Sequence, residues 1–423
     1  MNISPNTKQM DARAAAYAEP LETLDPAQPE LFQQDIMWPY FERLRKEDPV
    51  HFTPDSLYGP YWSITKFNDI VAVDTDHKTF SSEPRITMLP KDFVQREDDM
   101  RTGGMFIAMD PPKHDVQRLT VSPAVSPANL KIMEPLIRER AAGILDGLPI
   151  GEEFDWVDLV SKELTGMTLA TLFGMPQEDR RKLLFWSDVV TATPGQGLVE
   201  TEEEKHMHFM EYGAYFIDLW NKRVNADPTG DLISMLAHGD ATRGMDQGEY
   251  LGNVVLLTVG GNDTTRNTIT GSVLALNQNP DQYDKLRKNP DLIPSMVSET
   301  IRWQTPLAYM ARRATRDVDF QGKKIREGDK VAMWYVSGNR DEDVIENPND
   351  YIIDRERPRH HVSFGFGIHR CVGNRLAELQ LKIIWEEIMK RFPDIQVVGE
   401  PKRNYSTFVK GYERMNVVIP TRN

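Results

Sequence analysis

The only cysteine of the chain, Cys371, lies in the segment FGFGIHRCVGNRLAELQ, residues 364–380. A free cysteine is most often a small buried apolar residue, but glycines precede this one and a helical pattern follows it. Amides at the start of a helix stabilise a thiolate, which is the nucleophilic and metal-binding form. A dinucleotide-binding loop is excluded, because Arg370 occupies the place of the third glycine. Two roles remain: a nucleophile that needs a histidine base, and an axial ligand of haem iron.

The segment FGFGIHRCVG, residues 364–373, resembles the haem-binding signature F-G-x-G-x-H-x-C-x-G of the cytochrome P450 family at every defined position. This resemblance implies that haem b is the cofactor and that Cys371 is the axial ligand of its iron. The cofactor-binding residues that it implies in this segment are Phe364, Gly365, His369, Cys371 and Gly373. The glycines are then expected to let the haem approach the backbone.

A second part of the resemblance is the segment ETIR, Glu299–Arg302, which is similar to the E-x-x-R helix of the family. Residues three apart on a helix share one face, so the carboxylate and the guanidinium can pair. Arg355 occupies the position of the family arginine that completes this structural network. An exposed pair of this kind contributes little to stability, but a buried network is expected to hold the cysteine loop in place.

The two propionates of haem need cationic or hydrogen-bonding partners if the cofactor is buried. His114 and Arg118 lie four residues apart, match the H-x-x-x-R element of bacterial family members, and can point the same way. Arg312 matches the arginine of the family strand that reaches a propionate. Together with His369, these residues are the expected propionate contacts.

The segment GGNDTT, residues 260–265, lies within a long helical pattern and resembles the oxygen-activation element (A/G)-G-x-(D/E)-T of the family. Each glycine inside a helix costs roughly 1 kcal/mol relative to alanine, so we expect a local break that makes room for a ligand. The resemblance assigns the catalytic roles to Asp263 and Thr264, which would supply protons to bound dioxygen. The simpler alternative is a packing site in which Thr264 bonds its own helix.

The residues expected to line the substrate pocket are largely apolar, which predicts a hydrophobic substrate. They are Leu256, Val259, Gly260, Leu307, Ala308, Met310 and Phe408. Several segments, such as VSGNRDEDVIENP and FVKGYERMNVV, are similar to the bacterial branch that hydroxylates the terminal carbon of alkanes and fatty acids. The alternatives are a terpene or steroid hydroxylase of the same fold, and a haem-thiolate sensor or carrier without turnover.

The elements that must position these residues are mainly helical, with a minor β part. Residues 1–30 are polar and proline-bearing and are expected to form a loosely ordered leader. Residues 31–423 are expected to form one catalytic domain with the cytochrome P450 fold. Helical periodicity dominates from Pro111 to Pro306, and one long buried helix is expected to end near Asn279. The haem would lie between this long helix and the helix after Cys371.

Strand-like patterns are expected at VHFTP, YWSIT and MNVVIP, and as two strands joined through Gly322 in the segment 318–336. Asp110 is expected to cap a helix that begins at Pro111. Segments around residues 85–105 and 190–205 are candidate entry loops.

The composition limits the partners. The 423 residues carry a formal net charge of −14, which argues against nucleic acid and anionic membranes as main partners. No stretch approaches the roughly 20 apolar residues of a membrane span, and we expect a cytoplasmic protein. Electrons for an oxygenase would come from a separate ferredoxin and its NAD(P)H-dependent reductase. Arg370, Arg375 and Lys382 are candidates for a basic docking patch.

Overall fold

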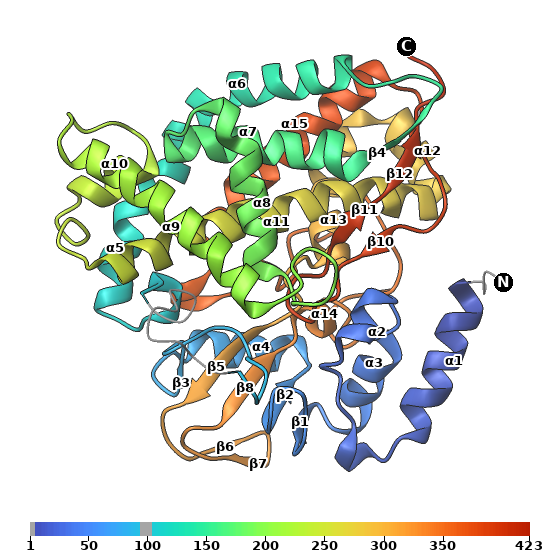
Figure 1. The fold of residues 1–423 in the computed structure, drawn as a ribbon. Coiled ribbons are helices and arrows are strands. Elements are labelled where there is room, and N and C mark those ends of the chain that lie inside the picture. Colours follow the sequence, from blue (N-terminus) through green and yellow to red (C-terminus); the bar gives the residue numbers. More distant parts are fainter. Residues whose placement is uncertain (1–4, 94–103) are drawn as a thin grey trace.

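The structure is a computed structural model that describes residues 5–93 and 104–423 of the chain. Its helices form most of the molecule, and the larger sheet lies at one end of it (Figure 1). The helices are α1 (Pro5–Ala18), α2 (Pro29–Gln33), α3 (Trp38–Glu47), α4 (Phe67–Thr75), α5 (Lys113–Val121), α6 (Pro127–Asp146), α7 (Glu163–Phe173), α8 (Arg180–Thr191), α9 (Glu202–Val224), α10 (Leu232–His238), α11 (Gln247–Gln278), α12 (Pro280–Lys288), α13 (Ile293–Gln304), α14 (Tyr335–Gly338) and α15 (Asn374–Arg391).

Short helical turns connect several of these helices. They are the 3₁₀ turns η1 (Leu21–Thr23), η3 (Phe106–Ala108), η4 (Ser122–Val125), η6 (Gln177–Asp179), η7 (Pro290–Leu292) and η8 (Gly367–His369), and the π-helical turn η5 (Val157–Lys162).

The strands are short and form small sheets. They are β1 (Val50–Thr53), β2 (Tyr61–Ile64), β3 (Phe80–Ser81), β4 (Glu153–Asp155), β5 (Met310–Ala314), β6 (Val318–Phe320), β7 (Lys323–Ile325), β8 (Lys330–Met333), β9 (Gln396–Val397), β10 (Lys402–Arg403), β11 (Tyr412–Arg414) and β12 (Asn416–Val418). The largest sheet has the order β1-β2-β8-β5-β3, and within it β2 and β8 are parallel. The mainly helical fold class with a minor β part is therefore confirmed.

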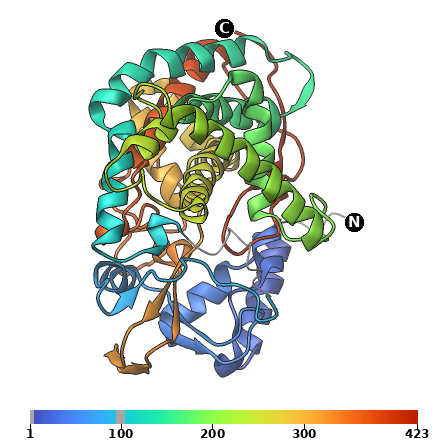
Figure 2. The same ribbon diagram turned by 60° about the vertical axis from the view of Figure 1, so that its left-hand side comes forward.

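Helix α11 crosses the interior of the helical part, and the surrounding helices enclose it in the turned view of Figure 2. Asp246 caps its start by accepting a hydrogen bond from the backbone amide of Glu249. The helix is 32 residues long and ends at Gln278, as the sequence predicts. Apolar residues of α11 belong to the largest core cluster, which also includes side chains of α6, α7, α13 and α15. The position of α11 is therefore fixed by its packing against these helices.

The β predictions are confirmed in part. Strands form at the three short patterns, but the segment 318–336 contains three strands instead of two. Strands β6 and β7 form a hairpin whose turn, Gln321–Gly322, has positive φ angles, and β8 joins the main sheet. The additional strand arises because β8 pairs with both β2 and β5, which are distant in sequence.

One expected helix boundary differs from the structure. Helix α5 begins at Lys113, and the side chain of Asp110 does not cap it. Asp110 instead accepts hydrogen bonds from Ser81 Oγ (2.5 Å) and from the backbone amide of Ser82 (3.3 Å). The Asp110 carboxylate bonds to this segment and not to the start of α5, because the Ser81 hydroxyl and the Ser82 amide both point toward it.

The expected loosely ordered leader contains helix α1, which packs beside α3 (Figure 1). Ala12 and Ala16 are buried, so α1 presents a small apolar stripe to its neighbour. Arg43 of α3 donates hydrogen bonds to the carbonyl oxygens of Ala16 and Glu19, both at 2.6 Å, and so satisfies the end of α1. These contacts explain why a polar segment is helical here.

Across residues 5–93 and 104–423, no helix has both the length and the apolar character that a membrane crossing requires.

Candidate active site

The cysteine loop leads into α15, which begins three residues after Cys371. The backbone amide of Cys371 donates to the carbonyl oxygen of Phe364 (2.8 Å), which closes the loop. Gly373 lies at the N-cap position, and a Cβ there would meet no atom within 4 Å. The sulfur therefore lies beside the first amides of the helix, as expected.

Gly365 and Gly367 have the turn geometry that was expected and a further packing role that was not. Both have φ near +64°, a conformation that favours glycine. A Cβ at Gly365 would lie 3.0 Å from Asp74 Oδ2, and one at Gly367 would lie 2.6 Å from the carbonyl oxygen of Asp74. These two glycines therefore also make room for α4 and for Tyr335, and the approach of haem to their backbone stays a prediction.

Asp74, at the end of α4, is a site residue that sequence reasoning missed. Its carboxylate accepts hydrogen bonds from the backbone amide of Phe366 (2.6 Å) and from Tyr335 Oη (3.2 Å). It also pairs with Arg312 Nη2 at 2.6 Å, and both side chains are buried. Asp74 thus ties the cysteine loop to strand β5. Nothing in the local sequence signals this role, because its partners come from distant segments.

The expected propionate contacts lie together. The rings of His114 and His369 contact each other edge to face, with centroids 4.3 Å apart. His114 Nε2 and both ring nitrogens of His369 are buried without a hydrogen-bond partner. Burial, together with the nearby charges of Arg312 and Arg118, lowers the pKa of His369 to about 2. Arg118 Nη2 donates to the carbonyl oxygen of Arg370 (2.5 Å), which places this arginine against the cysteine loop.

The thiol of Cys371 responds to two opposing influences. Burial raises its pKa, whereas the amides of Gly373 and Asn374 and the charges of Arg118 and Arg370 lower it. In the protein alone burial dominates, so the pKa lies above its ordinary value. The amides at the helix start lower the pKa of the thiol, as expected, but they do not outweigh burial. A bound cation would be needed to bring this pKa below its ordinary value.

The two glycines of α11 differ from each other. A Cβ on Gly260 would meet nothing within 4 Å, whereas one on Gly261 would lie 2.6 Å from Leu169 Cδ2. Gly260 faces open space and Gly261 allows α7 to pack closely. The expected local break is not present, because α11 runs without interruption through this region. The hydroxyl of Thr264 donates to the carbonyl oxygen of Gly260 (2.8 Å), so it bonds its own helix.

Asp263 is completely buried and points into a chain of charges. Its Oδ1 pairs with Arg266 Nη2 at 2.8 Å, while its Oδ2 has no hydrogen-bond partner. Arg266 also pairs with Asp188, whose second oxygen is 2.9 Å from Lys162 Nζ. The side chains of Asp188 and Lys162 are 17 % and 22 % exposed, so the chain runs from the core to solvent.

Burial raises the pKa of Asp263 to about 7; Arg266 opposes this shift and the charge of Asp188 adds to it. Burial alone would also raise the pKa of Asp188, but Arg266 and Lys162 together lower it. One carboxyl group therefore holds a proton near neutral pH while the other stays ionised. The spacing of Asp263 and Arg266 in the sequence is a signal for their pairing, but nothing local points to Asp188 or Lys162.

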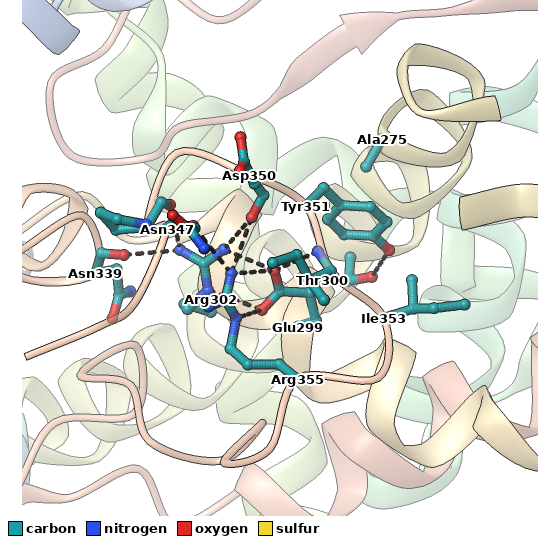
Figure 3. A network of polar contacts seen from close by, with 12 residues as sticks. Ala275, Glu299, Thr300, Arg302, Asn339, Asn347, Asp350, Tyr351, Ile353 and Arg355 are labelled. Atoms are coloured by element: carbon teal, nitrogen blue, oxygen red, sulfur yellow. Dashed lines mark hydrogen bonds and ion pairs between the residues drawn. The ribbon is translucent and has the colours of Figure 1, made fainter. Parts of the chain in front are cut away.

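The structural network around Glu299 is assembled as expected (Figure 3). Arg302 donates to both carboxylate oxygens, at 2.8 and 2.7 Å, and Arg355 Nε donates to Oε2 at 3.0 Å. The remaining donors of the two arginines reach backbone carbonyl oxygens, which belong to Asn339, Glu346, Asn347, Pro348 and Asp350. Each charge of this network is paired, and each guanidinium is satisfied.

The expected pocket residues divide into two groups. Leu256, Val259 and Gly260 are partly exposed along α11. Leu307, Met310 and Phe408 are also half-buried, and Phe408 packs against Tyr309. The prediction that Ala308 lines the pocket is corrected, because this residue is completely buried in a core cluster that includes side chains of α3. Its amide donates to the carbonyl oxygen of Phe408.

The candidate entry loops are described only in part. Residues 94–103 of the first loop lie outside the described residues. Before them, Ile86 and Met88 are buried, and the amide of Met88 donates to Tyr309 Oη. The second loop joins α8 to α9 and contains a bond between the amide of Gly195 and the carbonyl oxygen of Val199.

The residues present fit a haem group. Orphaned ring nitrogens of two histidines lie beside Arg118 and Arg312, as two anionic propionates require. A thiol lies beside the same arginine, Arg118. Open space at Gly260 leaves room beside α11. The histidines and Arg118 would hold the propionates, and Cys371 would bind the iron.

Known proteins resemble the chain over nearly all of its length. A family model described as "Cytochrome P450" matches residues 202–411. Linalool 8-monooxygenase of Pseudomonas putida is 34 % identical over 405 residues, covering 94 % of this chain and 99 % of that protein. A methyl-branched lipid omega-hydroxylase of Mycobacterium bovis is 32 % identical, with 89 % and 90 % covered. The solved structure of CYP153D17 from Sphingomonas sp. is 47 % identical, with a TM-score of 0.87 and 94 % and 98 % of the chains covered.

Proposed function

The chain belongs to the cytochrome P450 family and is a monooxygenase, and we propose that it hydroxylates the terminal carbon of medium-chain alkanes or fatty acids. The observation that carries this proposal is the partly exposed apolar face of α11. Leu256, Gly260 and Thr264 lie four residues apart and share one side of the helix. Leu257, Val259 and Gly261 in this stretch are also partly exposed, whereas Thr258, Asn262 and Asp263 are buried. An apolar substrate chain can therefore approach α11 at Gly260, which has no side chain, next to the hydroxyl group of Thr264.

Similarity supports the terminal position. The relative from Mycobacterium bovis is named an omega-hydroxylase of a lipid. The segments that resemble the terminal-hydroxylase branch extend from α11 to strands β11 and β12. A terpene hydroxylase is the second candidate, because the relative from Pseudomonas putida is named a linalool 8-monooxygenase.

We assign Asp263 and Thr264 to proton supply. With a pKa near 7, Asp263 can hold a proton on Oδ2, the oxygen that lacks a hydrogen-bond partner. Asp188 and Lys162 connect the same carboxyl group to the surface, so a lost proton can be replaced from solvent. Thr264 would orient a proton donor beside Gly260 by exchanging its bond to the carbonyl oxygen of that residue. When bound, haem supplies the activation of dioxygen.

Electrons are proposed to come from a ferredoxin that docks near the cysteine loop. Arg370 and Arg375 are exposed, whereas Lys382 is half-buried and lies 3.6 Å from Glu386. Arg375 is therefore the most informative residue to change. Arg375→Glu is expected to slow reduction by ferredoxin and to weaken its dependence on ionic strength, because an attractive charge is replaced by a repulsive one. Unchanged reduction rates would remove this residue from the docking surface.

The test of the function is product identification. The holoenzyme is supplied with a surrogate ferredoxin, its reductase and NADH, and with dodecanoic acid, octane and linalool together. Mass spectrometry then locates the new hydroxyl group. Hydroxylation mainly at the terminal methyl of the acid or the alkane is the expected result. Oxidation inside the chain, or of the terpene only, would overturn the substrate assignment.

Thr264→Ala in the same assay tests the proton-supply role. This variant is expected to consume NADH while forming little product. Thr268→Ala is the matched control, because Thr268 makes the same type of bond to its own helix, at 2.7 Å, one turn further along α11. Equal product yields from the two variants would contradict a special role for Thr264.

A further inference from the structure

A cavity of about 540 Å³ lies between α1, α3, the C-terminal part of α11 and the β10–β11 hairpin. Its volume is within the range of pockets that hold small organic ligands. The cavity reaches α11 at Gly271, seven residues and about 10 Å along the helix from Thr264. It is therefore separate from the candidate active site, and the function proposed above gives it no role.

The walls of the cavity carry an excess of positive charge. Five cationic and two anionic side chains line it, and some of these pair with each other or with residues outside. Glu42 pairs with Arg13 and Lys46, and Arg45 pairs with Glu342.

Three cations remain, Arg340, Arg403 and Lys410, and they face one carboxylate, Asp35. Two of these four groups keep unsatisfied atoms, since Asp35 Oδ1 and Arg403 Nη1 are buried without partners. The other carboxylate oxygen, Oδ2, is 3.0 Å from Arg403 Nη2. One carboxylate cannot neutralise three cations.

Arg340 is the clearest sign of a ligand. Only 6 % of this residue is exposed, yet no carboxylate of the described residues pairs with it. Its guanidinium lies 3.8 Å from the ring centre of Trp303 and 4.6 Å from that of Trp38. Within the described part of the chain, its guanidinium donates one hydrogen bond, to the carbonyl oxygen of Pro348 (3.2 Å). Burial and the charge of Arg302 hold the pKa of Arg340 well below its ordinary value. A bound anion would therefore offset the free-energy cost of burying this unpaired charge.

The rest of the lining is mixed: Gln9, Gln278, Gln304 and Asn349 are polar, and the other side chains are mainly apolar or aromatic. Met10, Trp38, Leu274, Trp303 and Tyr412 contribute to the walls. A guanidinium presents parallel donors that match a carboxylate, while the aromatic and aliphatic surface suits a hydrocarbon body. The ligand that fits both parts is an amphiphilic acid.

We propose that this cavity is a second ligand site, which binds the carboxylate of a small amphiphilic acid to Arg340 and Lys410 and its apolar part to the aromatic walls. This inference does not depend on the substrate of the enzyme. Lys410 Nζ donates to the carbonyl oxygen of Gln304 (3.0 Å) and lies 5.3 Å from the ring centre of Trp38, so it marks the same end of the cavity. Pro348 also accepts a bond from Arg302, which connects the site to the Glu299 network.

The test measures binding of radiolabelled dodecanoate to the holoenzyme by equilibrium dialysis, with the haem pocket blocked by phenylimidazole. We expect one molecule to remain bound per chain. Lys410→Met is expected to weaken this binding at least tenfold, whereas Lys402→Met on the same hairpin, 63 % exposed, leaves it unchanged. Arg340→Gln is a second variant with the same expected direction. Fluorescence of Trp38 and Trp303 provides an independent readout.

Three results would overturn the proposal. Complete loss of dodecanoate binding on blocking the haem pocket would show that there is no second site. Equal binding of dodecan-1-ol would remove the role of the cations. Displacement by inorganic phosphate at the same concentration would remove the role of the apolar walls. Because the active site is blocked in each case, none of these results bears on the proposed function.

Discussion

Two helices of this protein bury an acid and an arginine three residues apart, with opposite results. On α13, Glu299 and Arg302 are joined by Arg355, and the donors of both arginines find carboxylate or carbonyl oxygens. On α11, Asp263 and Arg266 are joined by a second acid, Asp188, and atoms of both residues stay unsatisfied. The same local pattern thus forms a fully hydrogen-bonded support in one place and a group that titrates near neutral pH in the other.

The difference lies in the third partner and in the backbone. An arginine added to an acid–arginine pair stabilises the carboxylate, and nearby carbonyl oxygens absorb the extra positive charge. An acid added to such a pair competes for the arginine and raises the pKa of the more deeply buried carboxyl group. Buried ion pairs should therefore be judged by their whole surroundings.

The largest effect is expected from Glu299→Gln. This change leaves two guanidinium groups without a carboxylate in a buried site, which costs about 3–5 kcal/mol in the free energy of unfolding. Denaturant unfolding of the holoenzyme measures it, with the exposed Glu211→Gln as a control expected to change by less than about 0.5 kcal/mol. If Glu299→Gln lowered the free energy of unfolding by less than about 1 kcal/mol, the Glu299 network would not be the stabilising one of the two.

Asp263→Asn is expected to lower product formation by about 10²–10⁴-fold, the usual contribution of a general acid, while the fold is retained. In the wild type, product formation should fall as the pH rises above 7, because only the protonated carboxyl group can donate. The Asn variant should lack this dependence. Product per NADH, measured across pH 6–9, checks the prediction, and retention of the alkaline decline in the variant would assign it to another group.

The stability of the same variant gives a second, smaller test. The folded protein keeps the proton of Asp263 up to about pH 7, whereas the unfolded chain releases it near the ordinary value of 3.8. The stabilisation from this group is therefore complete at low pH and is lost as the pH rises toward 7, at up to about 1.4 kcal/mol per pH unit. Asp263→Asn should remove that slope from the unfolding free energy between pH 4 and 7. Parallel curves for the two proteins would contradict the raised pKa.

The smallest effects are expected from the outer partners of Asp263, and they have opposite signs. Asp188 raises the pKa of Asp263 and Lys162 lowers it. Asp188→Asn should therefore move the alkaline decline of product formation to lower pH, and Lys162→Met should move it to higher pH. We expect changes of less than about tenfold in rate at pH 7. Shifts in the same direction would show that the two residues do not act through Asp263.

Local sequence patterns allowed much of the site to be predicted. The cysteine loop, the pairing of Glu299 with Arg302 and the proximity of His114 to Arg118 all depend on spacing along a helix or a turn, which the sequence shows directly. The reasons for individual glycines were less predictable. Gly365 and Gly367 accommodate Asp74 and Gly261 accommodates Leu169, whereas a Cβ at Gly260 or Gly373 would meet no atom within 4 Å.

The sequence by itself indicated the family and the mainly helical architecture, and it predicted Cys371 as the sulfur ligand and Asp263 as the acid beside Thr264. Its helical periods and signature spacings are local, and local order is encoded residue by residue. Tertiary structure alone decided which acid titrates, since that depends on Asp188 and Lys162 brought from other helices. It also decided that Asp74 holds the cysteine loop and that three cations meet around one cavity. Burial and charge are properties of the assembled molecule, so no single segment could reveal them.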